Sequence, residues 1–170
     1  MTADGHVFAC GEGEYGQLGL GHASINEHRP MRVKFYGMVP GDYVTQVACG
    51  AHHTLYLTRR RQVYASGLNN LGQLGIDSHE AQINRPAHVE HLCGLQVTEI
   101  AAGESSFAIT ASGDLYVWGL YNLQVRRKPQ LVTEMKRPVS SISQSFYGVT
   151  ACVDTAEQAW YWYACLDAKS

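Results

Sequence analysis

Residues 63–75 read VYASGLNNLGQLG, and the same order of strand-forming residues and spaced glycines occurs upstream, where residues 7–19 read VFACGEGEYGQLG. Residues 115–123, LYVWGLYNL, begin a third copy that lacks the Gly-Gln-Leu-Gly ending. The copies are offset by 56 and 52 residues, as counted between Gly11, Gly67 and Gly119. Recurrence at such a period indicates a repeat fold, in which a position has the same role in every unit.

Each unit contains four short β-rich segments. In the first unit they cover residues 6–10, 30–36, 44–49 and 54–58, and Pro30 is placed at the start of its strand, where proline is tolerated. No sustained i, i+3, i+4 apolar stripe predicts a helix. Four strands per unit are typical of a β-propeller blade. We therefore expect an all-β chain that forms a partial β-propeller of four-stranded antiparallel blades.

The repeats divide the chain into three units and part of a fourth. Their approximate bounds are 6–58, 61–110 and 113–153, with a fourth unit beginning at 156–170. We expect one domain, 1–170, that holds about three blades. Residues 1–5 match residues 109–113, which predicts that the chain begins inside a repeating array.

Composition narrows the functional class. Hydrophobic residues make up 45% of the chain and charged residues 16%, which favours a folded globular protein. A net charge of −2 offers no attraction to a phosphate backbone, so no direct nucleic-acid partner is expected. No apolar run reaches the roughly 18–20 residues of a membrane span, and no signal peptide is recognisable.

The cysteines favour a reducing compartment. Their odd number and wide spacing predict reduced, buried thiols rather than disulfides. The protein is therefore expected inside the cell, in the cytoplasm, the nucleus or a cytoskeletal or ciliary assembly. The five residues are Cys10, Cys49, Cys93, Cys152 and Cys165.

The ordered motifs resemble those of the regulator of chromosome condensation family. The resemblance rests on Gly16–Gly19 and Gly72–Gly75, on the Pro-x-x-Val pairs, and on residues 47–54 (VACGAHHT) with the echo IAAG at 100–103. It implies a ring of seven blades, of which this chain supplies less than half. It also implies a structural role for His53. In the third unit Ser145 stands where Gly50 and Gly103 stand in the others.

The repeated residues also have physical roles independent of any family. Glycine permits positive φ and close packing where a strand ends. Leu18 and Leu74, bracketed by glycines, are predicted to plug the gaps between adjacent blades. His53 and Thr54 are predicted to satisfy backbone groups that twisted sheets leave open. All of these roles are structural.

Motifs that carry chemistry have weaker support. Residues 11–16, GEGEYG, match a dinucleotide fingerprint, but proline and glycine rather than a helix follow. Adjacent strand residues such as His52 and His53 point to opposite faces and cannot chelate one metal ion together. No Gly-x-Ser-x-Gly elbow occurs. We expect no catalytic residue, no cofactor and no metal.

The favoured function is a non-catalytic protein–protein interaction or scaffold module that forms a piece of a larger chain or assembly. Propellers present loops from successive blades on one rim, and loops carry binding residues. The expected binding loops are Leu20–Arg29 and Ile76–Arg85, equivalent insertions between the first and second strands. The candidate contacts are His22, Asn26, Glu27, His79, Glu80 and Asn84.

Residues 160–163, WYWY, are a further candidate contact. Alternation places Trp160 and Trp162 on one face of a strand, and the unit that would cover them is incomplete. Truncation of the blade is the favoured explanation of this stretch, with a partner site as the alternative.

Two other functions remain open. The founding member of the family is a guanine-nucleotide exchange factor, so the resemblance implies a small GTPase as a possible partner. Alternatively, the chain is a structural component of a large complex that caps its open strand edges. The plant ultraviolet photoreceptor of this family packs tryptophans with arginines, and no Trp-Arg-His-Thr run occurs here.

Overall fold

The structure is a computed structural model that describes residues 1–22, 24–145 and 148–163. Within these residues the chain forms thirteen β-strands and one 3₁₀ helix, η1, at Glu90–Leu92, so no helix there is long enough to cross a membrane. The strands are β1 (Phe8–Gly13), β2 (Ser24–Arg32), β3 (Val44–Cys49), β4 (His53–Thr58), β5 (Val63–Leu68), β6 (Gln82–His88), β7 (Val97–Ala102), β8 (Ser106–Thr110), β9 (Leu115–Tyr121), β10 (Gln124–Leu131), β11 (Val139–Gln144), β12 (Val149–Asp154) and β13 (Ala159–Tyr163).

The strands form four antiparallel sheets. Two are four-stranded, ordered β3-β4-β5-β6 and β7-β8-β9-β10, and they are flanked by the pair β1-β2 and the three-stranded sheet β11-β12-β13. This confirms the all-β fold and the four-stranded antiparallel blades. Each repeat in the sequence supplies two strands to one sheet and two to the next, so the repeat and the blade are offset by two strands.

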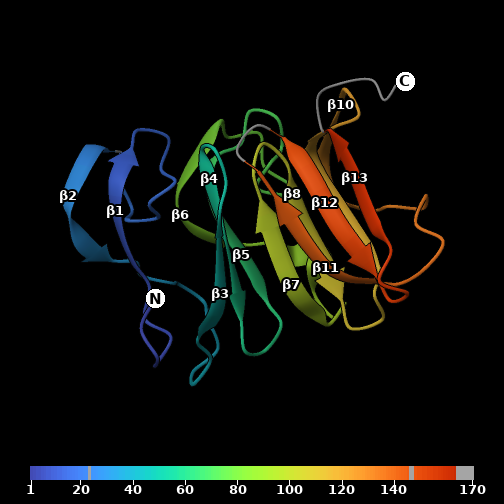
Figure 1. The fold of residues 1–170 in the computed structure, drawn as a ribbon. Helices are drawn as coiled ribbons and strands as arrows, with labels where there is room; N and C mark the ends of the chain where they lie inside the picture. Colours follow the sequence, from blue (N-terminus) through green and yellow to red (C-terminus); the bar gives the residue numbers. More distant parts are fainter. Residues whose placement is uncertain (23, 146–147, 164–170) are drawn as a thin grey trace.

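The sheets stand side by side in chain order, from β1–β2 in blue to β11–β13 in orange and red (Figure 1). The first strand of each later sheet is the inner one, because β7 contacts both β3 and β11. Successive sheets are therefore blades arranged around a common axis, as in a propeller.

Hydrophobic clusters fill the spaces between successive sheets. In β4, Tyr56 joins the cluster towards β1–β2, whereas Leu55 and Leu57 join the cluster towards the next sheet. In β8, Phe107 and Ala108 divide in the same way between the clusters on their two sides. Alternate residues face opposite sides of a strand, so a strand covered on both sides reads as a nearly continuous apolar run.

The outer strands share an irregularity at their prolines. Gly11 and Ala9 pair with Glu27 and Met31, so two extra residues of β2 bulge out opposite one residue of β1. Equivalent register shifts surround Pro86 in β6 and Pro129 in β10. The prediction that Pro30 begins its strand is wrong, because β2 begins at Ser24. Proline is accommodated here because a bulge on an edge strand requires no ladder donor.

The inner strands are joined by side-chain bonds to the backbone. Gln46 of β3 donates from Nε2 to the Ile100 carbonyl at 3.0 Å and accepts from the Ile100 amide through Oε1 at 3.0 Å. The equivalent residue of β7 is Glu99, whose Oε1 accepts from the Ile142 amide at 3.1 Å. A carboxylate has no donor for the Ile142 carbonyl. Glu99 therefore makes one hydrogen bond to the next inner strand where Gln46 makes two.

Replacing Glu99 by glutamine is expected to stabilise the fold. The Glu99→Gln side chain supplies the missing donor, and one such hydrogen bond is worth about 0.5–1.5 kcal/mol. Thermal unfolding should therefore occur a few degrees higher, since 1 kcal/mol corresponds to roughly 2–4 °C in a chain of this size. The control is Gln46→Glu, which places a carboxylate against the Ile100 carbonyl and should lower the melting temperature. Equal shifts of the melting temperature in the two variants would contradict this role of the Gln46 and Glu99 side-chain hydrogen bonds.

Candidate interaction surface on the loop rim

The connections at one end of the sheets form a rim, which we call the loop rim. It comprises residues 14–22, 50–52, 69–81, 103–105 and 122–123 and lies along the upper edge in Figure 1. Contacts join it across sheet boundaries: the rings of Tyr15 and His52 meet edge-on at 4.8 Å, and the Ala51 amide donates to the Gly103 carbonyl at 2.8 Å. The rim is therefore a continuous surface.

The two long loops reach over to the following sheet. The Thr54 hydroxyl of β4 donates to the Gln17 carbonyl at 2.8 Å, and the Ser106 hydroxyl of β8 donates to the Gln73 carbonyl at 2.6 Å. Leu18 and Leu74 are buried, as expected of plugs between blades. A Cβ on Gly75 would lie 2.7 Å from Trp118 Nε1, so the close packing requires glycine.

His53 has a structural role, although its partner differs from the expected one. Its Nε2 lies 2.7 Å from Ser106 Oγ, a side chain rather than a backbone group. Because that hydroxyl donates to the Gln73 carbonyl, Nε2 is the donor to Ser106. Burial lowers the pKa of His53 to about 4, with a smaller contribution from His52. This arrangement links two sheets and one loop through a single imidazole.

Of the three predicted contacts of the first loop, His22 lies on the loop rim and Asn26 and Glu27 lie in the adjoining strand β2. His22 is exposed, and its Nε2 lies 3.2 Å from the Oε1 of the half-buried Glu27. Asn26 and Glu27 belong to β2, paired with Glu12 and Gly11, rather than to a loop. The prediction of a loop throughout residues 20–29 is therefore wrong, because backbone pairing with β1 extends the strand into a polar sequence.

The second set of predicted contacts is divided. His79 and Glu80 are exposed in the β5–β6 loop, but Asn84 lies in β6, so residues 76–85 are also only partly loop. Asn84 is half-buried, and its carbonyl accepts from the Gly21 amide at 2.7 Å. This bond brings the first loop against β6, so that Asn84 supports the rim while His22, His79 and Glu80 are available on it.

The aromatic candidates lie elsewhere. Trp160 pairs with Cys152 near the start of β13, at the end of the sheet opposite the loop rim. Its side chain is 38% exposed, and its Nε1 donates to Asp154 Oδ2 at 3.2 Å. The side chain of Trp162 falls outside the described residues. The structure therefore does not bring Trp160 to the rim candidates.

The cysteine prediction needs correction. Cys10, Cys49 and Cys93 are free but exposed, and only Cys152 among the described cysteines is buried. Cys165 falls outside the described residues. Cys49 is the last residue of the inner strand β3, and the spacing of cysteines in the sequence does not reveal that this position is exposed.

The remaining candidate motifs have structural explanations. Gly11 lies within β1, Gly13 ends it, and residues 14–22 form turns rather than the helix that a dinucleotide site requires. The Nε2 atom of His88 lies 2.8 Å from the Oε1 atom of Gln62, within hydrogen-bond distance. Among the described residues no group of three or more His, Cys, Asp or Glu is placed to hold a metal ion. The basic residues Arg127 and Lys128 bind the preceding loop, at the Asn70 carbonyl and at Asp77.

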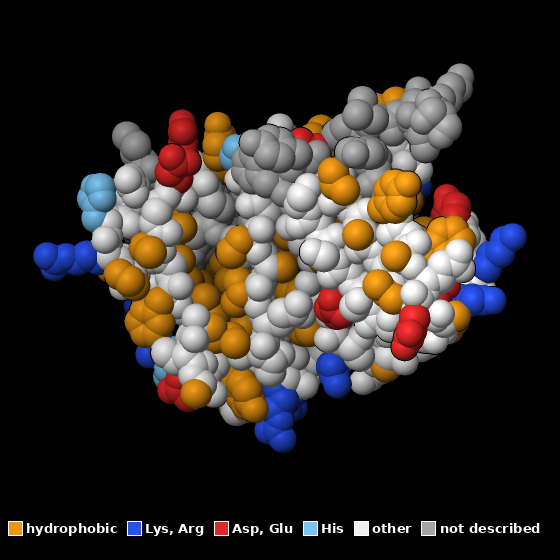
Figure 2. All heavy atoms as spheres, viewed as in Figure 1, with side chains coloured by type: hydrophobic (Ala, Val, Ile, Leu, Met, Phe, Trp, Pro, Cys, Tyr) orange, Lys and Arg blue, Asp and Glu red, His pale blue; other side chains and the backbone are white. Residues whose placement is uncertain are grey.

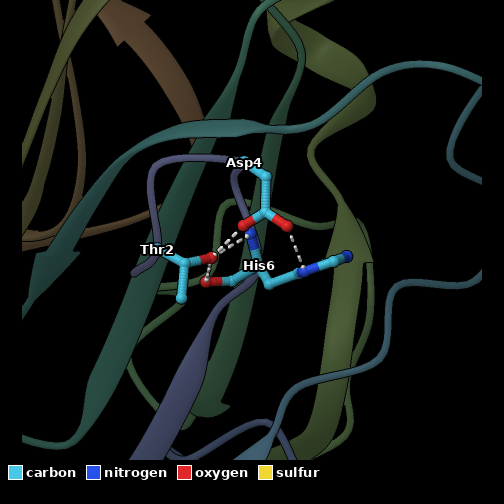
Figure 3. A network of polar contacts seen from close by, with 3 residues as sticks. All are labelled: Thr2, Asp4 and His6. Carbon is cyan, nitrogen blue, oxygen red and sulfur yellow. Dashed lines mark hydrogen bonds and ion pairs between the residues drawn. The ribbon is translucent and has the colours of Figure 1, made fainter.

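A His–Asp pair near the N-terminus resembles an acid–base dyad but caps a turn (Figure 3). His6 Nδ1 lies 2.9 Å from Asp4 Oδ2, and the Thr2 hydroxyl contacts Asp4 Oδ1 and accepts from the His6 amide. The hydrogen bond from Thr2 lowers the pKa of Asp4, with a further contribution from His6. The equivalent turn at 110–114 repeats the design, since Thr110 Oγ1 accepts from the Asp114 amide at 3.1 Å.

The surface outside the rim is mixed. In Figure 2 hydrophobic side chains gather over β1 and β3, while charged side chains are scattered over the rest of this face and around its edge. The exposed residues of these two sheets and their connection include Phe8, Met31, Tyr36 and Tyr43, each 38–59% exposed.

Comparison with known proteins identifies related sequences. A model of the regulator of chromosome condensation (RCC1) repeat matches residues 4–57 and 62–109, and a second model of that repeat matches residues 44–73. The chain is 38% identical over 120 residues to the human probable E3 ubiquitin-protein ligase HERC3, covering 70% of this chain and 11% of that protein. It is 37% identical over 121 residues to the bovine secretion-regulating guanine nucleotide exchange factor, covering 70% and 25%.

A third relative is the ultraviolet-B receptor UVR8 of Arabidopsis thaliana, 35% identical over 114 residues that cover 66% of this chain and 25% of the receptor. The chain thus spans between about a tenth and a quarter of the length of these relatives.

Solved structures agree on the fold. Human WBSCR16 superimposes with a TM-score of 0.82 at 26% identity, covering 98% of this chain and 46% of that one. Prp20p of Saccharomyces cerevisiae, whose structure was described with its binding properties to Gsp1p and histones, superimposes with a TM-score of 0.81 at 22% identity, covering 96% and 42%. The chain therefore corresponds to somewhat less than half of each of these structures.

Proposed function

The chain belongs to the regulator of chromosome condensation repeat family, and from this premise we propose that it is a non-catalytic protein-binding module whose loop rim contacts the partner. One observation carries the proposal. The glycines, His53 and Thr54 of the repeats are engaged in packing one sheet on the next, whereas His22, His79 and Glu80 are exposed side chains on the same rim. Exposed residues on a rigid scaffold are suited to recognition.

The relatives support a binding role without defining the partner. The yeast relative Prp20p is described by its binding to Gsp1p and histones, and it shares this fold. The ligase and exchange-factor relatives are much longer than this chain. They share only the repeat region with it, so the activity of the whole relative does not follow for this chain. We place the module in a reducing intracellular compartment, as part of a larger propeller or assembly.

Nucleotide exchange on a small GTPase is the second candidate function. The observation that favours it is the 37% identity to a protein named as a guanine nucleotide exchange factor. Structural capping within a large complex is a third, supported by the exposed Phe8 and Met31 on the two-stranded sheet. Nucleotide exchange and structural capping both require a protein partner. They differ in whether the chain accelerates a reaction of that partner.

Binding and exchange are tested together. The 170-residue chain is titrated against purified small GTPases and histones, and nucleotide release from the GTPases is followed by fluorescence. We expect saturable binding to at least one protein, with release at the background rate. The double variant His79→Ala/Glu80→Ala should weaken binding at least fivefold.

The matched control changes two exposed residues of the opposite rim, Glu134→Ala and Lys136→Ala, and should leave binding unchanged. Equal weakening by both variants would place the contact away from the loop rim. Accelerated nucleotide release would replace the non-catalytic proposal with the exchange-factor function.

A further inference from the structure

A cavity of about 280 Å³ opens on the loop rim, at the junction between the sheet of β3–β6 and the sheet of β7–β10. Gln73 and Glu104 contribute polar groups to its lining. Its apolar walls are three half-buried leucines, one at the end of β5, one in the loop that follows and one in β9: Leu68, Leu71 and Leu120. Small-molecule sites usually enclose about 300–1,000 Å³, so this cavity suits one side chain rather than a whole cofactor.

The preceding junction, between β1–β2 and the sheet of β3–β6, contains a pair of rings at the equivalent place. Tyr15 stands four residues after Gly11, as Leu71 stands four residues after Gly67. The backbone amides of Tyr15 and Leu71 each donate to the side chain of the glutamine two residues later, both at 2.9 Å. The Tyr15 ring meets the ring of His52 edge-on, with the centroids 4.8 Å apart. A tyrosine therefore occupies the position of Leu71 in that junction.

His52 corresponds to Glu104 in the following sheet. Each stands two residues before a hydroxyl of β4 or β8 that donates to a carbonyl of the preceding rim loop. The second junction thus has Leu71 and Glu104 where the first has the rings of Tyr15 and His52, and both replacements line the cavity. The cavity is open because neither of these two positions carries an aromatic ring in the second junction.

The charges around the cavity favour a neutral occupant that donates a hydrogen bond. The half-buried Glu104 supplies a carboxylate, whose two oxygens accept several hydrogen bonds. A cation already lies at the margin, because the Nη2 atom of Arg127 donates to the carbonyl of the cavity-lining Asn70 at 3.3 Å. These opposite charges leave little net attraction for a further cation. Tyrosine combines an apolar ring with a hydroxyl donor and meets both requirements.

We propose that this cavity binds a tyrosine side chain of a partner protein. The inference rests on the proposed function and names its anchoring contact. The ring takes the place that Tyr15 fills in the first junction and packs against Leu68, Leu71 and Leu120. The tyrosine hydroxyl donates to Glu104. Aromatic side chains that enter pockets within an interface supply a large share of the binding free energy, so this contact anchors the partner on the loop rim.

Four capped amino acids test the chemistry of the occupant. The N-acetyl amides of tyrosine, phenylalanine, arginine and leucine are each titrated into the full 170-residue chain, and binding is followed by NMR. We expect saturable chemical-shift changes with the tyrosine amide, at an affinity about two- to tenfold above that of the phenylalanine amide, the range for one hydrogen bond. The arginine and leucine amides should bind more weakly than both aromatic amides. Absence of saturation with the tyrosine amide, or tighter binding of the arginine or leucine amide, would overturn the proposal.

The variant Glu104→Met tests the polar contact. It removes the acceptor while keeping a side chain of similar length, so the tyrosine and phenylalanine amides should bind this variant with equal affinity. A preference for tyrosine that persists in Glu104→Met would show that the hydroxyl has another acceptor, and would overturn the assigned contact.

Filling the cavity tests its position. Leu71→Tyr copies the ring of the first junction, and Leu120→Tyr fills the cavity from the following sheet, so the test survives if one variant fails to fold. Each should weaken binding of the tyrosine amide at least about tenfold. The control is Leu123→Tyr, which adds the same ring at an exposed rim residue outside the cavity lining and should leave the affinity unchanged. Unchanged affinity in a folded filling variant would overturn the proposal.

The same variants separate this inference from the proposed function. If a GTPase or histone binds the unmodified chain and Leu71→Tyr equally well, the cavity is not the anchor while the proposed function stands. If Leu71→Tyr loses both the protein and the amide whereas Leu123→Tyr keeps both, the two proposals are supported together. If the amide binds in the cavity but no protein binds the unmodified chain, the proposed function fails while the cavity remains a tyrosine site.

Discussion

Acidification from pH 7 to pH 4 is expected to lower the free energy of unfolding by about 3 kcal/mol, because His53 is buried as a neutral imidazole. Its pKa falls from 6.5 to about 4 on folding, and each pKa unit corresponds to about 1.36 kcal/mol. Between these values the unfolded chain binds more protons than the folded one. The contribution of the neutral His53 ring to the free energy of unfolding is therefore complete above pH 6.5. It decreases as the pH falls towards 4 and is constant below that pH.

Urea unfolding at several pH values between 7 and 4 measures this effect. The control is His53→Gln, which keeps a donor for Ser106 but does not titrate. Between pH 6.5 and 4, the slope of the free energy of unfolding against pH should correspond to about one proton fewer in this variant than in the unmodified protein. An unchanged slope would mean that another group is responsible for acid unfolding.

Substitution of Gly67 by alanine is expected to destabilise the protein by more than about 4 kcal/mol, in the range that marks a backbone conflict. Gly67 has a φ of 118°, and a Cβ there would lie 2.4 Å from the His52 carbonyl oxygen and 2.6 Å from His53 Cα. Both are backbone atoms of β4 and its turn, so no side chain can rotate away. The melting temperature should fall by roughly 10 °C or more.

Gly11 is the matched control for this prediction. It occupies the equivalent position in β1 with a φ of 101°, yet a Cβ there would meet no atom within 4 Å. Gly11→Ala therefore measures the conformational cost alone, about 1–2 kcal/mol. If the two alanine variants lose equal stability, contact with β4 is not the reason for glycine at position 67.

Several features of the site could be read from the repeats. Leu18 and Leu74 were identifiable as plugs because the same residue recurs between glycines at one place in two units. The alternation of Leu55, Tyr56 and Leu57 between two cores follows from strand geometry. Asn26 and Asn84 were assigned to loops because their sequences are polar, whereas pairing with β1 and β5 makes them strand. An outer strand needs backbone partners but little apolar surface, so its composition resembles that of a loop.

The hydrogen bonds from Thr54 and Ser106 to the loops of the preceding sheets were also hidden, because the two residues differ and the turns before them differ in length. Only the ladder register, which pairs Thr54 with Cys49 and Ser106 with Ala102, reveals that the two hydroxyls are equivalent.

The amino-acid sequence by itself determined that this protein is built from repeated four-stranded antiparallel units, because period-2 apolar segments and glycines at fixed spacing restrict the backbone locally. The tertiary structure alone decided where one blade ends and the next begins, and which polar residues join strands. These properties depend on hydrogen bonds and contacts between segments 33 to 54 residues apart, such as Ser106 with Gln73 and Gln46 with Ile100. Local sequence preference contains no information about such distant pairs until the sheets pack against one another.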